Sequence, residues 1–244
     1  MKKILLGVTL VAVLAVCGSV WWLYRSLDST ATSAIRTYGP EIVGVSLKLS
    51  SLRIVPADGN AVLRGLVVGN PKGYKTDRAI ALGEMGMVID AGSLTTNVIL
   101  IKKITITGAD ISYEYGAGGS NLDAIQGNIN RYVAEHLSAK ETPAAKGPTK
   151  KFIIDNLVVV GGKITVSAAA LQGKTITLDL PTVNLRGIGR KHGGATAGEI
   201  AQQVMGGLNY NAARAASRAN LGGAADALKK ETGPAGDKIK ELIK

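Results

Sequence analysis

The sequence predicts a mainly β protein with an antiparallel, curved or groove-shaped sheet built from repeated hairpin units. The strongest observation is a repeat: the stretch 101–115 (IKKITITGADISYEY) returns at 154–166 (IDNLVVVGGKITV), with an offset of 53 residues between Ile101 and Ile154. In both copies apolar and polar residues alternate on either side of a glycine, as a half-buried strand requires. The glycine itself favours a turn between the two runs. Composition agrees, because 31 glycines and 4% aromatic residues suit many short strands better than a thick aromatic core.

The N-terminal segment, residues 1–25, is predicted to be a transmembrane helix. Lys2 and Lys3 precede an apolar run, Ile4–Tyr24, that contains no charge, and about 20 such residues span a bilayer. The lysines hold the N-terminus in the cytoplasm, so the rest of the chain emerges on the other side. A cleaved signal peptide and a lipoprotein signal at Cys17 are the alternatives. The residues that match an interfacial membrane anchor are Trp21, Trp22, Tyr24 and Arg25.

Residues 26–194 are expected to form a β-domain beyond the membrane. Its first strand covers 45–49, where apolar and polar residues alternate. Ser50 and Ser51 then shift the phase, so that Leu52 and Ile54 continue on even positions, and a β-bulge or a bend produces such a shift. Further alternating runs predict strands at 80–90, 98–107 and 176–180.

Two helical segments and a linker complete the expected order. The helix near 120–137 is amphipathic and begins with a capping box of Ser120 and Asp123. The linker near 138–150 is polar and contains two prolines. The segment 195–244 is predicted to be an Ala-rich, basic helix that also begins with a capping box. It can pack on the sheet, contact an anionic membrane or stay mobile, and its thin apolar stripe favours a solvated or partner-bound helix.

The sequence carries no constellation typical of an enzyme, a metal site or a cofactor site. His136, His192 and Cys17 are the only histidines and cysteine, so no Cys/His set has metal-ligand spacing. The acidic residues are scattered, and nothing selects a pair for acid–base chemistry. We therefore predict a non-catalytic protein without a metal or cofactor. The net charge of +11 favours anionic partners, but export and the lack of an aromatic-basic platform argue against nucleic acid.

Two stretches resemble the AsmA-like family of bacterial envelope proteins. One is 63–74 (LRGLVVGNPKGY) with the following 81–84 (ALGE), and the other is the first repeat copy followed by 121–125 (NLDAI). The resemblance implies a protein anchored in the bacterial inner membrane, with its bulk in the periplasm and a curved sheet whose apolar face holds acyl chains. Larger relatives are thought to bridge the two membranes for phospholipid movement. Strands about 4.8 Å apart would make this sheet only about 40–50 Å long, so this short member would act locally or as one module among partners.

The apolar strand faces admit two interpretations: a dry core closed by the helix near 120–137, or an open groove for lipid. The alternation alone favours neither, and the resemblance favours the groove. The headgroup of a bound lipid would then meet Arg186, Arg190 and Lys191. The candidate groove residues are Val45, Leu47, Leu49, Ile104, Ile106, Ile111, Tyr113, Leu157, Val159, Ile164, Val166, Ile176, Leu178 and Leu180.

The function expected from these patterns is that of a membrane-anchored periplasmic lipid-binding protein in phospholipid transport or outer-membrane homeostasis. Its partners would be membrane lipid and a further envelope protein. The alternative is a non-catalytic membrane-anchored scaffold or assembly factor that docks another envelope protein, through its sheet edge or face, by β-augmentation. Lipid that co-purifies with the protein distinguishes the two.

Overall fold

The computed structural model describes residues 27–116, 118–138, 150–168 and 175–218. The predicted anchor with Trp21, Trp22, Tyr24 and Arg25, most of the predicted linker and the end of the C-terminal segment lie outside the described residues. Among the helices that the structure describes, none is both long and apolar enough to cross a membrane.

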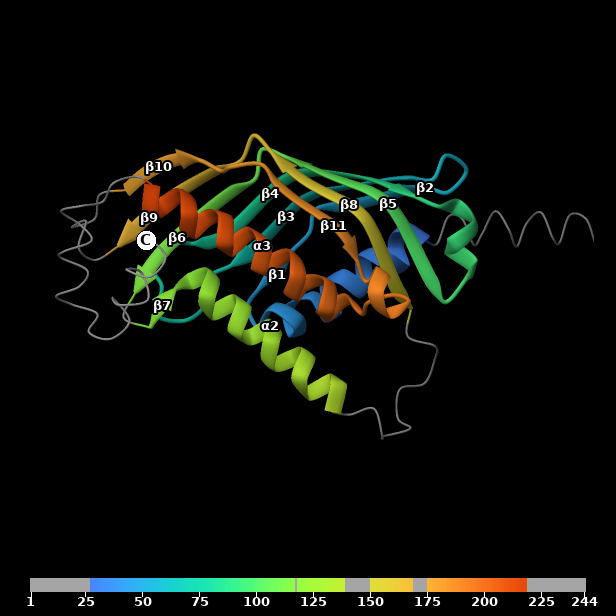
Figure 1. Cartoon of the computed structure of the whole chain (residues 1–244), viewed down its shortest axis with the longest axis horizontal. Helices are drawn as coiled ribbons and strands as arrows, with labels where there is room; N and C mark the ends of the chain where they lie inside the picture. Colours follow the sequence, from blue (N-terminus) through green and yellow to red (C-terminus); the bar gives the residue numbers. More distant parts are fainter. Residues whose placement is uncertain (1–26, 117, 139–149, 169–174, 219–244) are drawn as a thin grey trace, which may run out of the picture.

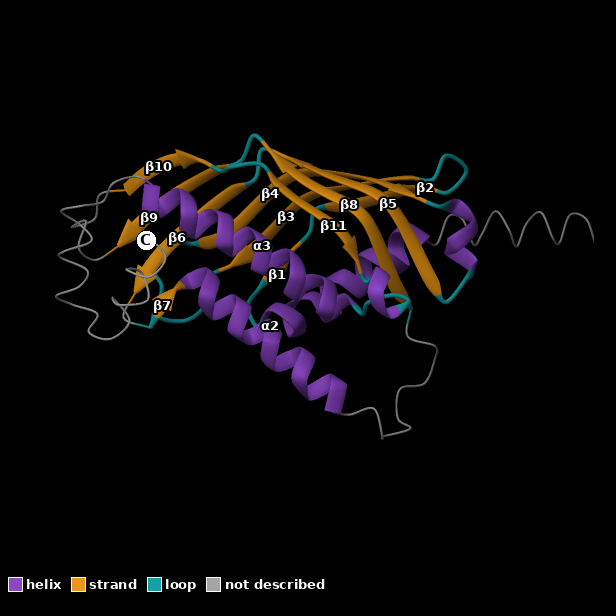
Figure 2. Ribbon diagram, viewed as in Figure 1, coloured by secondary structure: helices purple, strands orange, loops and turns teal. Residues whose placement is uncertain are grey.

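The described chain forms one arched sheet with helices beneath its concave side (Figures 1 and 2). Residues 27–43 form the N-terminal helix, which precedes the first strand. The other helices are α2 (Asn121–Ser138) and α3 (Ala197–Arg218), with short 3-10 turns η1 (Ala91–Thr95) and η4 (Arg190–His192). The strands are β1 (Leu47–Lys48), β2 (Ser51–Val55), β3 (Asn60–Gly69), β4 (Arg78–Ile89), β5 (Val98–Thr107), β6 (Asp110–Gly116), β7 (Gly119–Ser120), β8 (Lys151–Val160), β9 (Lys163–Ala168), β10 (Thr175–Asp179) and β11 (Val183–Ile188).

The sheet is mixed, so the expected all-antiparallel order is wrong, although the mainly β class is confirmed. The strand order is β10-β9-β6-β4-β5-β8-β11, and β3 joins β4 to β1 and β2 on the other side. β5 pairs with β8, and β6 with β9, in parallel. Parallel neighbours need a long crossover connection, and α2 lies between the two repeat copies and supplies it.

The repeat is not a pair of hairpins, so the expectation of repeated hairpin units is wrong. β5 and β6 run in the same direction along one side of β4, because Thr107 lies opposite Glu84 and Asp110 opposite Ala81. Gly108, with φ +63°, bends one long strand instead of reversing it, as a glycine bulge does. The two copies lie side by side, with Ile101 beside Ile154 and Ile111 beside Ile164. The sequence alignment of the repeat is therefore the register of the strands.

The same bend crosses the whole described sheet. β1–β2, β5–β6, β8–β9 and β10–β11 each form one interrupted long strand beside the continuous β3 and β4. A row of paired apolar residues crosses these long strands on one side of the bend: Leu47, Val68, Ile80, Ile111, Ile164 and Leu178. A second row crosses them on the other side: Leu52, Leu63, Met85, Ile106, Val159 and Val183.

The two rows explain the arch. In every long strand the two row members are five positions apart, for example Ile106 and Ile111, or Val68 and Leu63. Strict alternation has a period of two, so residues on one face should be an even number apart. Each strand therefore carries one extra residue at the bend, and inserted residues of this kind bend a sheet. The phase shift predicted at Ser50 and Ser51 is confirmed as part of this line, since Ser50 N lies within 3.2 Å of Arg64 O and 3.3 Å of Gly65 O.

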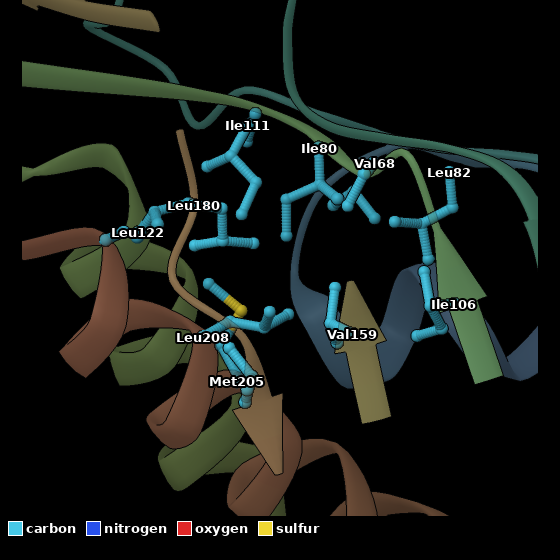
Figure 3. Packing of buried hydrophobic residues seen from close by; sticks show 14 of the residues in the cluster. Val68, Ile80, Leu82, Ile106, Ile111, Leu122, Val159, Leu180, Met205 and Leu208 are labelled. Carbon is cyan, nitrogen blue, oxygen red and sulfur yellow. The ribbon is translucent and has the colours of Figure 1, made fainter. Parts of the chain in front are cut away.

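The concave side of the arch holds the main hydrophobic core. Side chains of the first row and most of the second meet Leu122, Ile125, Ile129 and Val133 of α2 there. They also meet Met205, Leu208, Ala212, Ala215 and Ala216 of α3, and Ile42 of the N-terminal helix. Leu52 and Leu63 of the second row form a smaller cluster with Leu49. In Figure 3, Met205 and Leu208 lie across from Ile80, Ile111 and Val159 of the sheet. The described part of the C-terminal segment thus packs on the sheet and is not the solvated helix favoured from the sequence.

Candidate functional site

Most of the candidate groove residues lie in this core, and Leu49 lies in the smaller cluster. Ten of the fourteen are buried: Leu49, Ile104, Ile106, Ile111, Tyr113, Leu157, Val159, Ile164, Val166 and Leu180. Val45, Leu47 and Leu178 pack half-buried against the same core, and Ile176 is also half-buried. Side chains of the helices cover the apolar face of the sheet. The described residues therefore form a closed core, the first of the two interpretations, and not an open groove. Burial raises the pKa of Tyr113 to about 12, as expected for a phenol held away from water.

The two ends of the sheet can be told apart by where the described chain begins. The Asp28 carboxylate accepts a hydrogen bond from Ile54 N at 2.7 Å. The N-terminal helix therefore starts beside the end of β2, and we call this the proximal end of the sheet. The opposite end, where β3 ends and β6 passes into β7, is the distal end.

The predicted headgroup residues lie together at the proximal end. Arg186 is at the end of β11, and Arg190 and Lys191 are in η4. All three side chains are exposed, and the Arg190 guanidinium forms an ion pair with Asp155 of β8. The structure places Lys150 and Lys151 next to them, because Phe152 and Ala195 exchange backbone hydrogen bonds of 2.8 Å. Sequence reasoning missed these two lysines, which lie about 40 positions earlier in the chain.

A buried polar cluster at the distal end was also missed. Asn121, fully buried at the start of α2, donates hydrogen bonds to Ser112 O at 2.7 Å and to Asn70 Oδ1 at 2.8 Å. Its Oδ1 accepts one from Glu114 N at 3.0 Å. The Asn121 side chain therefore bonds to β6 much as a neighbouring strand would. It also joins the two stretches that carry the AsmA-like resemblance.

Glu114 completes this distal polar cluster, which we define as Asn70, Thr76, Glu114 and Asn121. The buried Glu114 carboxylate accepts hydrogen bonds from Lys75 N at 2.6 Å and from Thr76 N at 2.8 Å. The Thr76 hydroxyl donates a third at 2.9 Å. The carboxylate is thus occupied in holding the loop before β4, and this geometry is that of a structural fastener.

The two edges of the sheet differ in how their backbone groups are covered. On the β1–β2 edge, Arg36 of the N-terminal helix donates to Leu49 O at 2.7 Å and Asp28 accepts from Ile54 N. β10 and β11 form the other edge, and each has one strand neighbour. No hydrogen bond between described residues joins a side chain to the backbone of β10 or β11. Among the described residues, the β10–β11 edge therefore presents more backbone groups without a side-chain partner than the β1–β2 edge does.

The described acidic and histidine side chains do not gather into a metal site. No group of three or more His, Cys, Asp or Glu side chains is placed to hold a metal ion in the part of the chain that the structure describes. The comparisons with known proteins add no assignment, since no protein-family model and no curated protein matches the chain. The AsmA-like resemblance thus rests on the two motifs alone.

Proposed function

We propose that this chain is a non-catalytic scaffold of the cell envelope, anchored by its N-terminal segment, that docks another envelope protein. The observation that carries the proposal is the closed concave face. The residues that a lipid carrier would use to hold acyl chains, such as Ile111, Ile164 and Val159, are at most 1% exposed beneath α2 and α3. A folded domain whose apolar face is already covered must meet its partner through another surface.

The β10–β11 edge is the docking surface that the sheet offers. No described side chain bonds to its backbone as Asp28 and Arg36 do on the opposite edge. An extended segment of a partner can add to such an edge by main-chain hydrogen bonds. Pro181 separates β10 from β11 and cannot donate to an added strand. We therefore expect the partner to pair with one half of the edge, over five or six residues.

Site-specific photo-crosslinking in cells tests this docking. In separate variants a photoreactive residue replaces Thr177 on β10 or Asn184 on β11, which are both exposed, and a control replaces Thr107, which is exposed on β5 in the middle of the sheet. The proposal predicts one discrete adduct from position 177 or 184 and none from position 107. Peptide mapping of that adduct should identify an extended segment of one envelope protein. No adduct from either edge position, or equal adducts from the edge and the control, would contradict the docking.

Lipid binding is the second candidate, and one observation favours it. The second half of α3 covers the sheet with Ala212, Ala215 and Ala216. Apolar burial stabilises by about 25 cal/mol per Å², so small side chains hold this half of the helix less firmly than leucines would. A lipid carrier would need α3 to leave the sheet and expose the apolar rows.

Native mass spectrometry of the full chain, after exchange into lipid-free detergent, separates the two candidates. The comparison is between the natural chain and a Leu82→Asp variant that stays folded, since Leu82 is buried in the same core. The scaffold proposal predicts that the two retain the same amount of phospholipid, because any bound lipid lies outside the core. Phospholipid that the natural chain retains and the variant loses would instead support the carrier.

A further inference from the structure

We infer that the proximal end of the sheet is a membrane-facing surface that binds anionic lipid headgroups. The inference rests on the anchor in the proposed function, but not on which protein is docked. It concerns the basic cluster formed by Lys150, Lys151, Arg186, Arg190 and Lys191. These residues come from two segments of the chain, and their side chains are exposed.

The fold holds the two segments of the basic cluster in one place. The paired hydrogen bonds between Phe152 and Ala195 fix the turn after η4 against the start of β8. The Lys150 ammonium donates to the backbone carbonyls of Leu94 and Thr96, which ties η1 to the same surface. The basic cluster is therefore held in place by hydrogen bonds between three segments of the fold.

The carboxylates nearest the basic cluster already have partners. Asp155 pairs with Arg190, and Asp90 pairs with Lys102 at 2.9 Å. Glu199 accepts from Thr196 N at 2.7 Å, and this hydrogen bond and, to a smaller extent, the nearby Lys151 ammonium lower the pKa of Glu199. Lys151 and Lys191 form no direct ion pair with a residue that the structure describes. The five basic side chains of the cluster thus outnumber the two carboxylates beside them, Asp155 and Glu199, and the excess positive charge can meet an external anion.

The position of the N-terminal helix indicates that the external anion is a lipid headgroup. Because the described chain starts beside Ile54 at the proximal end, an anchor formed by the preceding residues places the bilayer next to this end. Lysine and arginine side chains within a Debye length of an anionic membrane, about 8–10 Å, are attracted to its surface. The strands then lead away from the membrane, and the distal polar cluster lies at the far end.

Fluorescence quenching in nanodiscs tests this orientation on the full chain. With Cys17 replaced by Ser, one fluorophore is attached at Asn97→Cys, proximal and exposed, or at Thr175→Cys, distal and exposed. The discs contain a headgroup-quencher phosphatidylcholine, with or without 30 mol% phosphatidylglycerol. The inference predicts quenching at position 97 that is at least twofold stronger than at position 175 in the anionic discs. It also predicts that 0.5 M NaCl reduces this difference.

A matched pair of charge variants makes the test specific. Lys151→Gln with Lys191→Gln should remove the extra quenching at position 97, whereas Lys72→Gln with Lys75→Gln, the same charge change at the distal end, should not. Equal quenching at both positions, or no effect of the proximal variants, would overturn the inference and leave the anchored scaffold standing. A chain that does not enter the discs would overturn the anchor itself, and the orientation with it.

Discussion

The helices α2 and α3 cover the same concave face with different chemistry. α2 presents Leu122, Ile125, Ile129 and Val133, four large side chains that are all buried. α3 presents Met205 and Leu208 in its middle and only alanines after them. α3 also contains Gly198, Gly206 and Gly207, each of which costs about 1 kcal/mol of helix propensity relative to alanine.

This difference shows that α2 is an integral part of the core, whereas α3 is a layer that closes it. α2 is joined to the sheet at its start by Asn121, through hydrogen bonds to Ser112 and Glu114. α3 is joined to α2 by outer polar contacts, such as Asn209 Nδ2 to Asp123 Oδ1 at 2.8 Å. The proposed function requires that α3 stays packed on the sheet. Variants in α2 and α3 therefore test it by comparing how much each helix contributes to stability.

The largest effect is expected in α2. Ile125→Ala leaves a cavity at a side chain that is fully buried beneath the arch, and should lower the free energy of unfolding by about 3–4 kcal/mol. Urea denaturation followed by circular dichroism measures it. The control Val88→Ala changes a side chain that is 40% exposed and should cost less than about 0.5 kcal/mol. Equal costs for the two variants would mean that α2 is not packed on the sheet.

The second-largest loss of stability is expected in the distal polar cluster. Asn121→Ala leaves the buried Glu114 N and Ser112 O without their side-chain partner, so we expect a loss of about 2–3 kcal/mol. The matched change in α3 is Asn211→Ala, which removes one hydrogen bond to Gly207 O on the same helix, and should cost less than about 0.5 kcal/mol. Denaturation midpoints compared at an unchanged m-value decide between these outcomes.

A smaller loss is expected in α3. Leu208→Ala removes one of the two large buried side chains of α3, Met205 and Leu208, and should cost about 2 kcal/mol, at the low end for buried leucines. Tyr210→Ala, which changes a side chain 55% exposed on the same helix, serves as the control and should be near neutral. A Leu208→Ala variant as stable as the control would show that α3 is not part of the folded core.

The smallest effect is expected at the start of α3, and it depends on pH. Glu199→Ala removes the carboxylate that accepts hydrogen bonds from Thr196 N and Thr196 Oγ1 in the capping box and should cost about 1 kcal/mol at pH 7. The backbone N–H of Thr196 lowers the pKa of Glu199. The stabilisation is therefore complete above the unfolded-state pKa, about 4.3, and is lost as pH falls through the folded-state value. Thermal melts should therefore show a smaller deficit of the variant at pH 3 than at pH 7.

Much of the local structure could be predicted from sequence. Alternation located the strands, and the capping boxes located the helix starts: Ser120 N to Asp123 Oδ2 is 3.0 Å, and Thr196 N to Glu199 Oε2 is 2.7 Å. The repeat also aligned Ile106 with Val159, which the sheet pairs directly. These features are local or depend on identical patterns in two copies, and so they can be read from the chain alone.

Strand direction and the closing of the apolar face could not be predicted from those patterns. Parallel and antiparallel strands share a period of two, and a glycine such as Gly108 suits a bulge as well as a turn. The signals that distinguish them are the helix between the copies and the odd spacing of five across each bend. Nothing local pairs Asn70 with Asn121, 51 positions apart, because that contact depends on the assembled distal end.

Hydrogen–deuterium exchange of the full chain in nanodiscs tests the central claim, a concave face kept closed by α3, most directly. Mass spectrometry compares amides at 200–212 in α3 with those of β5 and β8. If the face stays closed, the α3 amides should exchange only when the sheet also unfolds, and their protection factors should be of the same order of magnitude as those of β5 and β8. Exchange in α3 that is many times faster, while β5 and β8 stay protected, would contradict a closed face. The apolar rows would then be exposed in the native protein, as a lipid carrier requires.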